Sequence, residues 1–219
     1  TIWEELGITS THELMEACQS GKVAKIKGFG EKTQDTIIQN LEFKASNAGK
    51  WPYADIETSI ANFEKELQEL YPEAAIAIVG DFARKMEIIS EAEFLIGLDS
   101  LFGGKEKLKS LDTIIWDLSQ SSPFSWRGTL KEVNLKVSAH FTTKKDFLWK
   151  KLSLIASPAH LAELVDEKES ISERLAKRNY DSEISFFEVN GLQYIPVEMR
   201  EGFGEVGLAK ANEIPELLK

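Results

Sequence analysis

Two acidic residues, Glu91 and Glu93, are the side chains whose types and spacing are best suited to chemistry in this sequence. They lead into a short apolar run, residues 94–96, that predicts a β-strand. Because side chains alternate along a strand, both carboxylates lie on one face, and Ala92 and Phe94 lie on the other. Two carboxylates on one face can hold a divalent cation between them, or they can form a solvated acidic edge. The residues alone leave both interpretations open.

A second candidate site combines glycines with lysines. Gly28 and Gly30 lie in the connection between two predicted helices. Lys25, Lys27 and Lys32 flank the two glycines. Glycines in such a connection permit unusual dihedral angles and bring backbone N–H groups at a helix start close to a phosphate. This is the pattern of a helix-hairpin-helix that binds DNA, and it is equally the pattern of an interhelical turn that only packs.

The elements that position these residues follow from apolar periodicity. Ser10 and Glu13 form a capping box for the first helix, and residues 44–54 have the composition of a linker. A mixed sheet with helices on one face is the expected architecture. We predict strands over 74–79, 94–96, 113–118, 124–130 and 132–139, and helices over 10–18, 31–43, 55–70, 105–111, 146–156, 158–167, 170–179 and 181–191.

Composition limits the class of protein. The chain has 219 residues, of which 42% are hydrophobic, and a net charge of −10. The charge excludes a surface that binds nucleic acid everywhere, so any DNA contact is local. No apolar run is long enough to span a membrane, and the single cysteine, Cys18, suits a reducing compartment, so we expect a cytoplasmic protein with no membrane partner.

The segment GDFAR at 80–84, followed six residues later by Glu-x-Glu, resembles the nucleotidyltransferase signature of family X DNA polymerases, the DNA polymerase beta group that includes the bacterial PolX type. In that family the pattern reads Gly-Ser-x-x-Arg and then Asp-x-Asp, in which the aspartates bind two catalytic magnesium ions and the Ser and Arg hold the triphosphate. The resemblance implies metal binding at Glu91 and Glu93 and phosphate binding by Arg84.

The same resemblance points to altered chemistry. The segment VNLKV at 133–137 is similar to a Val-Asp-Leu-Arg-Val strand that delivers the third catalytic aspartate, and the implied position here is Asn134. An amide lacks the negative charge that helps to hold the second metal. Asp81 places an anion where the family has a serine, and like charges repel. Residues 154–158, LIASP, lack the tyrosine and glycine of the family's Tyr-Phe-Thr-Gly-Ser.

The resemblance covers nearly the whole chain and implies an α+β fold. The implied regions are helix-hairpin-helix fingers over 1–48, a nucleotidyltransferase palm with a mixed β-sheet over 49–142, and a helical thumb-like region over 143–219. The tail at 192–202 closely resembles the family's Gly-Leu-Pro-Tyr-Ile-Pro-Pro-Glu-Leu-Arg-Glu-Gly, and we interpret Arg200 in it as a packing residue.

The function predicted from these features is a catalytically impaired DNA-binding module in DNA repair, part of a longer chain, with no cofactor, or with Mg²⁺ if activity remains. Gapped or primer-template DNA is the expected partner. Two alternatives stay open. One is an active template-directed nucleotidyltransferase that uses Glu91 and Glu93 with two divalent metals and Glu132 as the third acid; the other is a scaffold that binds a protein partner.

Overall fold

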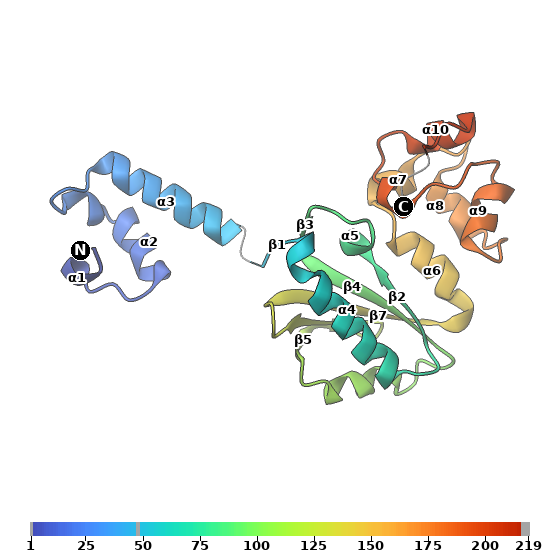
Figure 1. Cartoon of the computed structure of the whole chain (residues 1–219), viewed down its shortest axis with the longest axis horizontal. Coiled ribbons are helices and arrows are strands. Elements are labelled where there is room, and N and C mark those ends of the chain that lie inside the picture. The colour runs from blue at the N-terminus through green and yellow to red at the C-terminus, as the bar shows by residue number, and fades with distance from the viewer. Residues whose placement is uncertain (1, 47–48, 216–219) are drawn as a thin grey trace. The chain divides into compact units, whose positions relative to one another are not determined.

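The computed structural model describes residues 2–46 and 49–215 (Figure 1). The chain divides into two compact units, Thr1–Ala48 and Gly49–Lys219. The first unit is helical, and the second combines helices with a five-stranded sheet. This is an α+β fold, as the sequence predicts.

Short helices make up the first unit. Its small core contains Ile8, Cys18 and Val23, all buried. The capping box is confirmed, because the Ser10 hydroxyl accepts from the N–H of Glu13, whose carboxylate accepts from the N–H of Ser10. The elements are α1 (Ile2–Leu6), α2 (Thr11–Gln19), the 3₁₀ turn η1 (Val23–Lys25) and α3 (Glu31–Ser46).

The sheet of the second unit has the strand order β2-β4-β7-β6-β5. The neighbouring inner strands β4 and β7 run parallel, and the other pairs are antiparallel, so the predicted mixed sheet is confirmed. The strands are β2 (Ala75–Val79), β4 (Glu91–Leu98), β5 (Ile114–Ser122), β6 (Ser125–Leu130) and β7 (Leu135–Thr143). A separate pair joins β1 (Trp51–Pro52) to β3 (Ile88–Ile89).

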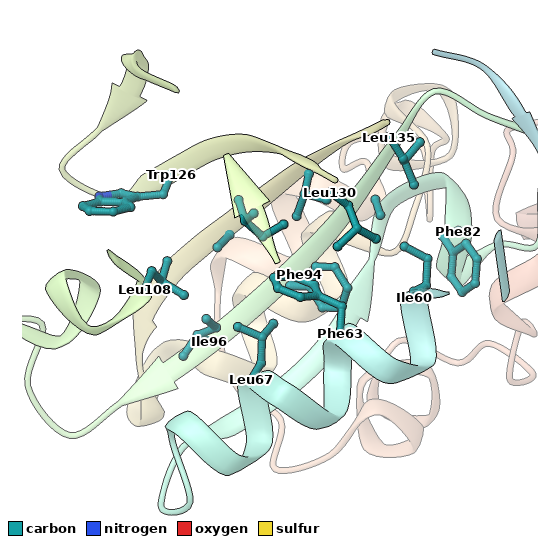
Figure 2. Close-up of a cluster of buried hydrophobic side chains, with 14 of the residues drawn as sticks. Ile60, Phe63, Leu67, Phe82, Phe94, Ile96, Leu108, Trp126, Leu130 and Leu135 are labelled. Atoms are coloured by element: carbon teal, nitrogen blue, oxygen red, sulfur yellow. The ribbon is translucent and has the colours of Figure 1, made fainter. Parts of the chain in front are cut away.

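Helix α4 (Tyr53–Leu70) covers one face of this sheet (Figure 2). Its inner residues, Ile56, Ile60, Phe63 and Leu67, lie at helical spacing and are buried. Each such side chain contributes about 1.5–3 kcal/mol when it leaves water. The helix begins before its predicted start at residue 55, because Pro52 takes the N-cap position and fixes the backbone at the helix entry.

Helices cover the second face of the sheet as well, which corrects the expectation of one helical face. Val79 and Leu95 point away from α4 and belong to a second core with α6 and the helices that follow it. Gly97 of β4 admits α6 closely, since a Cβ there would lie 2.6 Å from the ring of Phe147. These elements are α5 (Gly80–Ala83), α6 (Phe147–Leu154), α7 (Pro158–Ala162), α8 (Ile171–Ala176), α9 (Glu183–Val189) and α10 (Glu205–Ala211), with 3₁₀ turns η2 (Gly104–Ser110), η3 (Lys144–Asp146) and η4 (Val197–Met199).

Two of the predicted elements end or begin differently because a turn intervenes. Residues 131–134 form the turn between β6 and β7 and do not belong to the strand predicted over 132–139, and Asn134 adopts a left-handed φ of 51° there. The helix predicted over 158–167 ends at Ala162, because the Val165 N–H donates to the Glu169 carbonyl in a tight loop. In the second place local hydrogen bonding in the loop outweighs the apolar pattern. Across the described residues, no helix is long and apolar enough to cross a lipid bilayer.

Candidate functional site

Glu91 and Glu93 lie on the same face of β4, as predicted. Both are half-buried, whereas Ala92 and Phe94 between and beyond them are fully buried on the opposite face against α4. The two carboxylates therefore stand on the face that carries Leu95 and, further along, α6. The helices cover the far part of this face and leave the start of β4 more open.

Strand β7 supplies the partners of both carboxylates. The Ser138 hydroxyl donates a hydrogen bond to the Glu91 carboxylate, and Nε2 of His140 lies 2.8 Å from Oε2 of Glu93. The parallel register places Ser138 directly opposite Glu93, so both partners project from the same face as the acids. Glu91 is therefore paired with a neutral hydroxyl, and Glu93 is paired with an imidazole.

Asn134 lies outside this arrangement. It sits in the turn before β7, and Glu91 is opposite Lys136 in the register. The residues that contact the two acids, Ser138 and His140, were missed by sequence reasoning. The available signal was the alternation of polar residues along the strand, Lys136, Ser138 and His140, on one face.

Gly80 fixes the position of Glu93 from the other side. It follows β2, whose last residue, Val79, pairs with Glu93. Gly80 has a φ of 68°, and a Cβ on it would lie 2.2 Å from Oε1 of Glu93. The glycine at the start of the GDFAR segment is thus required both by its backbone conformation and by the close approach of the carboxylate.

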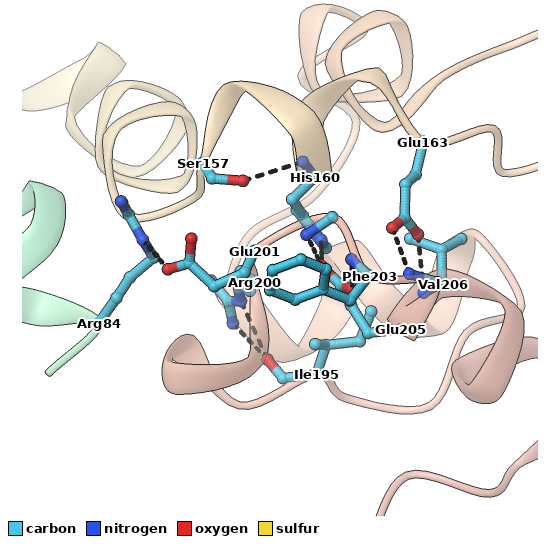
Figure 3. A network of polar contacts seen from close by, with 12 residues as sticks. Arg84, Ser157, His160, Glu163, Ile195, Arg200, Glu201, Phe203, Glu205 and Val206 are labelled. Atoms are coloured by element: carbon cyan, nitrogen blue, oxygen red, sulfur yellow. Dashed lines mark hydrogen bonds and ion pairs between the residues drawn. The ribbon is translucent and has the colours of Figure 1, made fainter. Parts of the chain in front are cut away.

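Arg84 is held by two carboxylates. It is only 8% exposed, and its guanidinium donates to Asp81 in the same turn. It also donates to Glu201 in the tail (Figure 3). The neighbouring Lys85 pairs with Glu198 at 2.9 Å, which raises the pKa of Lys85 through the hydrogen bond and the charge of that carboxylate. The basic pair of the GDFARK segment is therefore neutralised by acids of the chain itself.

The residues present do not fit a pair of magnesium ions. In the part of the chain that the structure describes, no three His, Cys, Asp or Glu side chains gather into a set that could hold a metal ion. One oxygen of Glu93 is used by His140, and one of Glu91 by Ser138. Magnesium demands near-ideal octahedral oxygen coordination, and a hydroxyl and an imidazole are poor substitutes for a third carboxylate.

A hollow of about 370 Å³ lies beside Glu91, between β5, β6 and β7. Its lining combines Glu91 and Asp117 with two cations, Arg127 and Lys136. Both cations are exposed, so a phosphate oxygen could reach them from solvent.

The lysine and glycine cluster of the first unit is solvent-accessible. Lys25, Lys27 and Lys32 are exposed, and so are Gly28 and Gly30. Gly28 has a φ of 94°, and the carbonyl of Gly30 accepts the first helical hydrogen bonds of α3 from residues 33 and 34. The first N–H groups of α3 therefore emerge among three lysines, which is a suitable arrangement for a phosphate.

The helical end of the second unit is organised by buried polar residues (Figure 3). Nδ1 of His160 lies 2.7 Å from Oε1 of Glu205, and Glu205 also accepts from the N–H groups of Gly202 and Phe203. Burial lowers the pKa of His160, and Glu205 opposes that shift only in part. Burial alone would raise the pKa of Glu205, but the backbone N–H groups and His160 outweigh it and lower that pKa.

Arg200 is buried in the same region. It is 1% exposed, donates to the Ile195 carbonyl and to Glu183 at 2.6 Å, and lies over the ring of Phe187. The interpretation of Arg200 as a packing residue agrees with these contacts. Ser157 of the 154–158 segment caps α7 by accepting from the N–H of His160, so it serves the helix start.

Comparison with known proteins gives one match among curated sequences and many among solved structures. The chain is 24% identical over 219 residues to the DNA polymerase/3′-5′ exonuclease PolX of Bacillus subtilis (strain 168), covering 94% of this chain and 38% of that protein. A crystal structure of Leishmania infantum polymerase beta, a ternary P/T complex, matches with a TM-score of 0.54 and 15% identity over 91% of both chains. No family model matches.

The structural match shows a polymerase beta-like fold, and the carboxylate pair lies on the β4 strand of its sheet. The chain is a family X DNA polymerase-like protein with a polymerase beta-like fold. It spans about 38% of the length of its PolX relative.

Proposed function

We propose that this chain is a catalytically impaired DNA-binding module in DNA repair, in which a fingers-like region over 1–48, a palm over 49–142 and a thumb-like region over 143–219 are retained without efficient chemistry. The observation that carries the proposal is the pairing of Glu91 with Ser138 and of Glu93 with His140. Two-metal phosphoryl transfer needs carboxylates that bridge metals at the attacking and leaving oxygens. Here two acids face a hydroxyl and an imidazole.

The state of Arg84 supports the same proposal. An arginine that binds a triphosphate needs free N–H groups that point at the ligand. Nε of Arg84 donates to Glu201 and Nη2 donates to Asp81, and Asp81 adds a negative charge close to where a triphosphate would have to enter. A nucleotide would have to displace Glu201 and overcome the repulsion of Asp81.

Binding to gapped or primer-template DNA is supported by two basic features. One is the exposed cluster of Lys25, Lys27 and Lys32 around the Gly28–Gly30 turn; the other is the pair Arg127 and Lys136 beside Glu91. Both are local, as a chain with a net charge of −10 requires. The Leishmania protein whose fold matches was crystallised as a ternary P/T complex, and we extend DNA binding to this chain on that basis.

Primer extension on gapped DNA tests the catalytic part of the proposal. We expect no incorporation, with Mg²⁺ or Mn²⁺, above the level of the double variant Glu91→Ala/Glu93→Ala. Binding to the same DNA at low salt tests the second part, with Lys27→Glu and Gly28→Val as variants that weaken it. Absence of DNA binding in the wild-type chain would favour a protein-interaction scaffold instead.

The alternative function, an active nucleotidyltransferase, is favoured by one observation: Glu91 and Glu93 share a face and retain negative side chains. Its third acid would be Glu132, which lies in the β6–β7 turn beside Asn134. Incorporation that disappears in Glu91→Ala and in Glu93→Ala would establish this function and refute the impaired module. Loss of incorporation in Glu132→Ala as well would assign the third acid.

A further inference from the structure

A second hollow, also of about 370 Å³, lies where β7 passes into α6, on the same sheet face as Glu93. Its lining is mainly apolar and aromatic, with a few polar groups, which is the composition of small-ligand sites. The residues that matter are Phe124, Ser125, His140, Thr142, Trp149 and Lys150. We call this hollow the Trp149 pocket.

Trp149 forms a preorganised aromatic wall of this pocket. The guanidinium carbon of Arg178 lies 4.2 Å from the centre of its ring, and Arg178 is itself paired with Asp146, another lining residue. Phe124, at the end of the β5–β6 hairpin, provides a second aromatic side chain and is 62% exposed. An exposed phenyl ring and a fixed indole that line the same hollow are suited to a flat, aromatic ligand.

The polar groups of the pocket favour a nucleotide as that ligand. Ser125 Oγ is buried, and no hydrogen-bond partner for it exists among the described residues. Rotation of the Ser125 side chain toward the hollow would let a ligand with hydrogen-bonding groups on its edge satisfy it. Lys150 belongs to the segment KKDFLWKK at 144–151, which carries four lysines and one aspartate in a chain of net charge −10. Aromatic rings interspersed with lysines are the usual platform for unpaired bases.

We propose that the Trp149 pocket binds an unpaired base of a single-stranded DNA segment, with the base against Trp149 and Phe124 and its phosphate near Lys150. The proposal deepens the proposed function, because it rests on DNA as the partner and adds a single-strand subsite to duplex binding. His140 lines the pocket and contacts Glu93, so this subsite adjoins the altered carboxylate pair.

The test compares two fluorescein-labelled DNA hairpins, one blunt and one with a 3′ tail of about six thymidines, a length within the site sizes of single-strand binders. Binding to the full chain is measured by fluorescence anisotropy. We expect the tail to raise the affinity of the wild-type chain about tenfold. Phe124→Ala and Lys150→Gln should remove most of this gain and leave binding of the blunt hairpin unchanged.

Two matched variants serve as controls. Phe102→Ala removes a phenyl ring that is 97% exposed and does not line the pocket, and Lys145→Gln removes a lysine of the same segment that does not line it. Both should keep the gain from the tail. The proposal is overturned if the tail gives no gain, if Phe124→Ala retains it, or if Phe102→Ala loses it equally.

The same experiment separates this proposal from the proposed function. If the blunt hairpin does not bind but a free oligothymidylate of about 12 nucleotides does, duplex binding fails and the single-strand subsite stands, provided that Phe124→Ala weakens the binding of that oligonucleotide. Phe124 is exposed at a hairpin end, so its truncation does not threaten folding; a circular dichroism spectrum identical to that of the wild type verifies this.

Discussion

Glu93 lies hydrogen-bonded to His140, a residue of the adjacent parallel strand, with 2.8 Å between Oε2 and Nε2. Ser138, two residues earlier on that strand, donates to Glu91, so the two acids have partners on the same strand face. The carboxylates of Glu91 and Glu93 would repel each other, but these hydrogen bonds satisfy both of them without a cation.

If a missing carboxylate is what prevents cation binding, restoring it should create a metal site. We predict that Ser138→Asp destabilises the metal-free chain, because three carboxylates then repel each other, and that Mn²⁺ reverses this. At a metal concentration about 100 times the Kd, binding adds about 2.7 kcal/mol. For a domain of this size that raises Tm by about 5–10 °C.

Thermal unfolding with and without Mn²⁺ measures the effect of Ser138→Asp. The control Ser110→Asp places the same charge on an exposed serine at the end of η2 and should show no Mn²⁺-dependent rise. Equal shifts in both variants would mean that the metal acts on the chain in general and not at the carboxylate pair.

We predict that adding a single methyl group at Gly80 lowers the unfolding free energy strongly. Gly80→Ala forces a left-handed residue with a side chain and drives its Cβ into Oε1 of Glu93. The backbone alone costs about 1–2 kcal/mol, and displacing Glu93 from His140 brings the expected loss of unfolding free energy to about 2–4 kcal/mol. Urea denaturation measures it.

Gly207 provides the matched control for Gly80. It lies exposed inside α10, and a Cβ there would meet no atom within 4 Å among the described residues. Gly207→Ala should raise the unfolding free energy by about 0.5–1 kcal/mol, since alanine favours a helix interior. Similar effects of the two substitutions would show that Gly80 is not constrained by Glu93.

The salt dependence of DNA binding by the first unit should report the number of phosphate contacts that it makes. Each phosphate contact that is lost lowers the slope of log K against log salt by about 0.9. Lys27→Glu should therefore reduce the slope for gapped DNA by about 1 and weaken binding at low salt. Lys65→Glu, an equal charge change on the exposed face of α4, should leave the slope unchanged; a slope that falls equally would place the contact outside the Gly28–Gly30 turn.

Sequence patterns predicted the acidic face of β4 and the inner face of α4 because each is locally encoded. The alternation around Glu91 and Glu93 requires only a strand, and the apolar spacing of Ile56, Ile60 and Phe63 requires only a helix against a sheet. The second helical face was missed because Leu95 and Val79 lie in strands that are apolar on both sides. The sequence of such a strand is a continuous apolar run, which does not show that helices cover both faces of the sheet.

The partners of the carboxylates could not be read from the sequence, because they depend on strand register. Ser138 and His140 reach Glu91 and Glu93 only through the parallel pairing of β4 with β7, whose segments lie more than forty residues apart. The motif similarity directed attention to Asn134, which the structure places in the preceding turn. Likewise, nothing local to Arg84 indicates that Glu201 pairs with it.

The buried pair of His160 and Glu205 predicts that acid destabilises the helical end of the second unit. The pKa of His160 is lowered from 6.5 in the folded chain, so below that pH the unfolded chain takes up the proton first and the stability falls. The pKa of Glu205 is lowered from 4.5, which adds a further loss below that pH. The contribution of the pair is therefore complete above about pH 6.5 and declines toward pH 4, by up to about 1.4 kcal/mol per pH unit for each group. Urea unfolding at about pH 7.5, 6.5 and 5.5 measures this slope.

His160→Gln keeps a donor toward Glu205 and cannot titrate, so its slope between about pH 5 and 7 should be flatter than that of the wild type. His12→Gln, at an exposed position in the first unit, should leave the slope unchanged, and a wild-type slope in His160→Gln would refute the assignment.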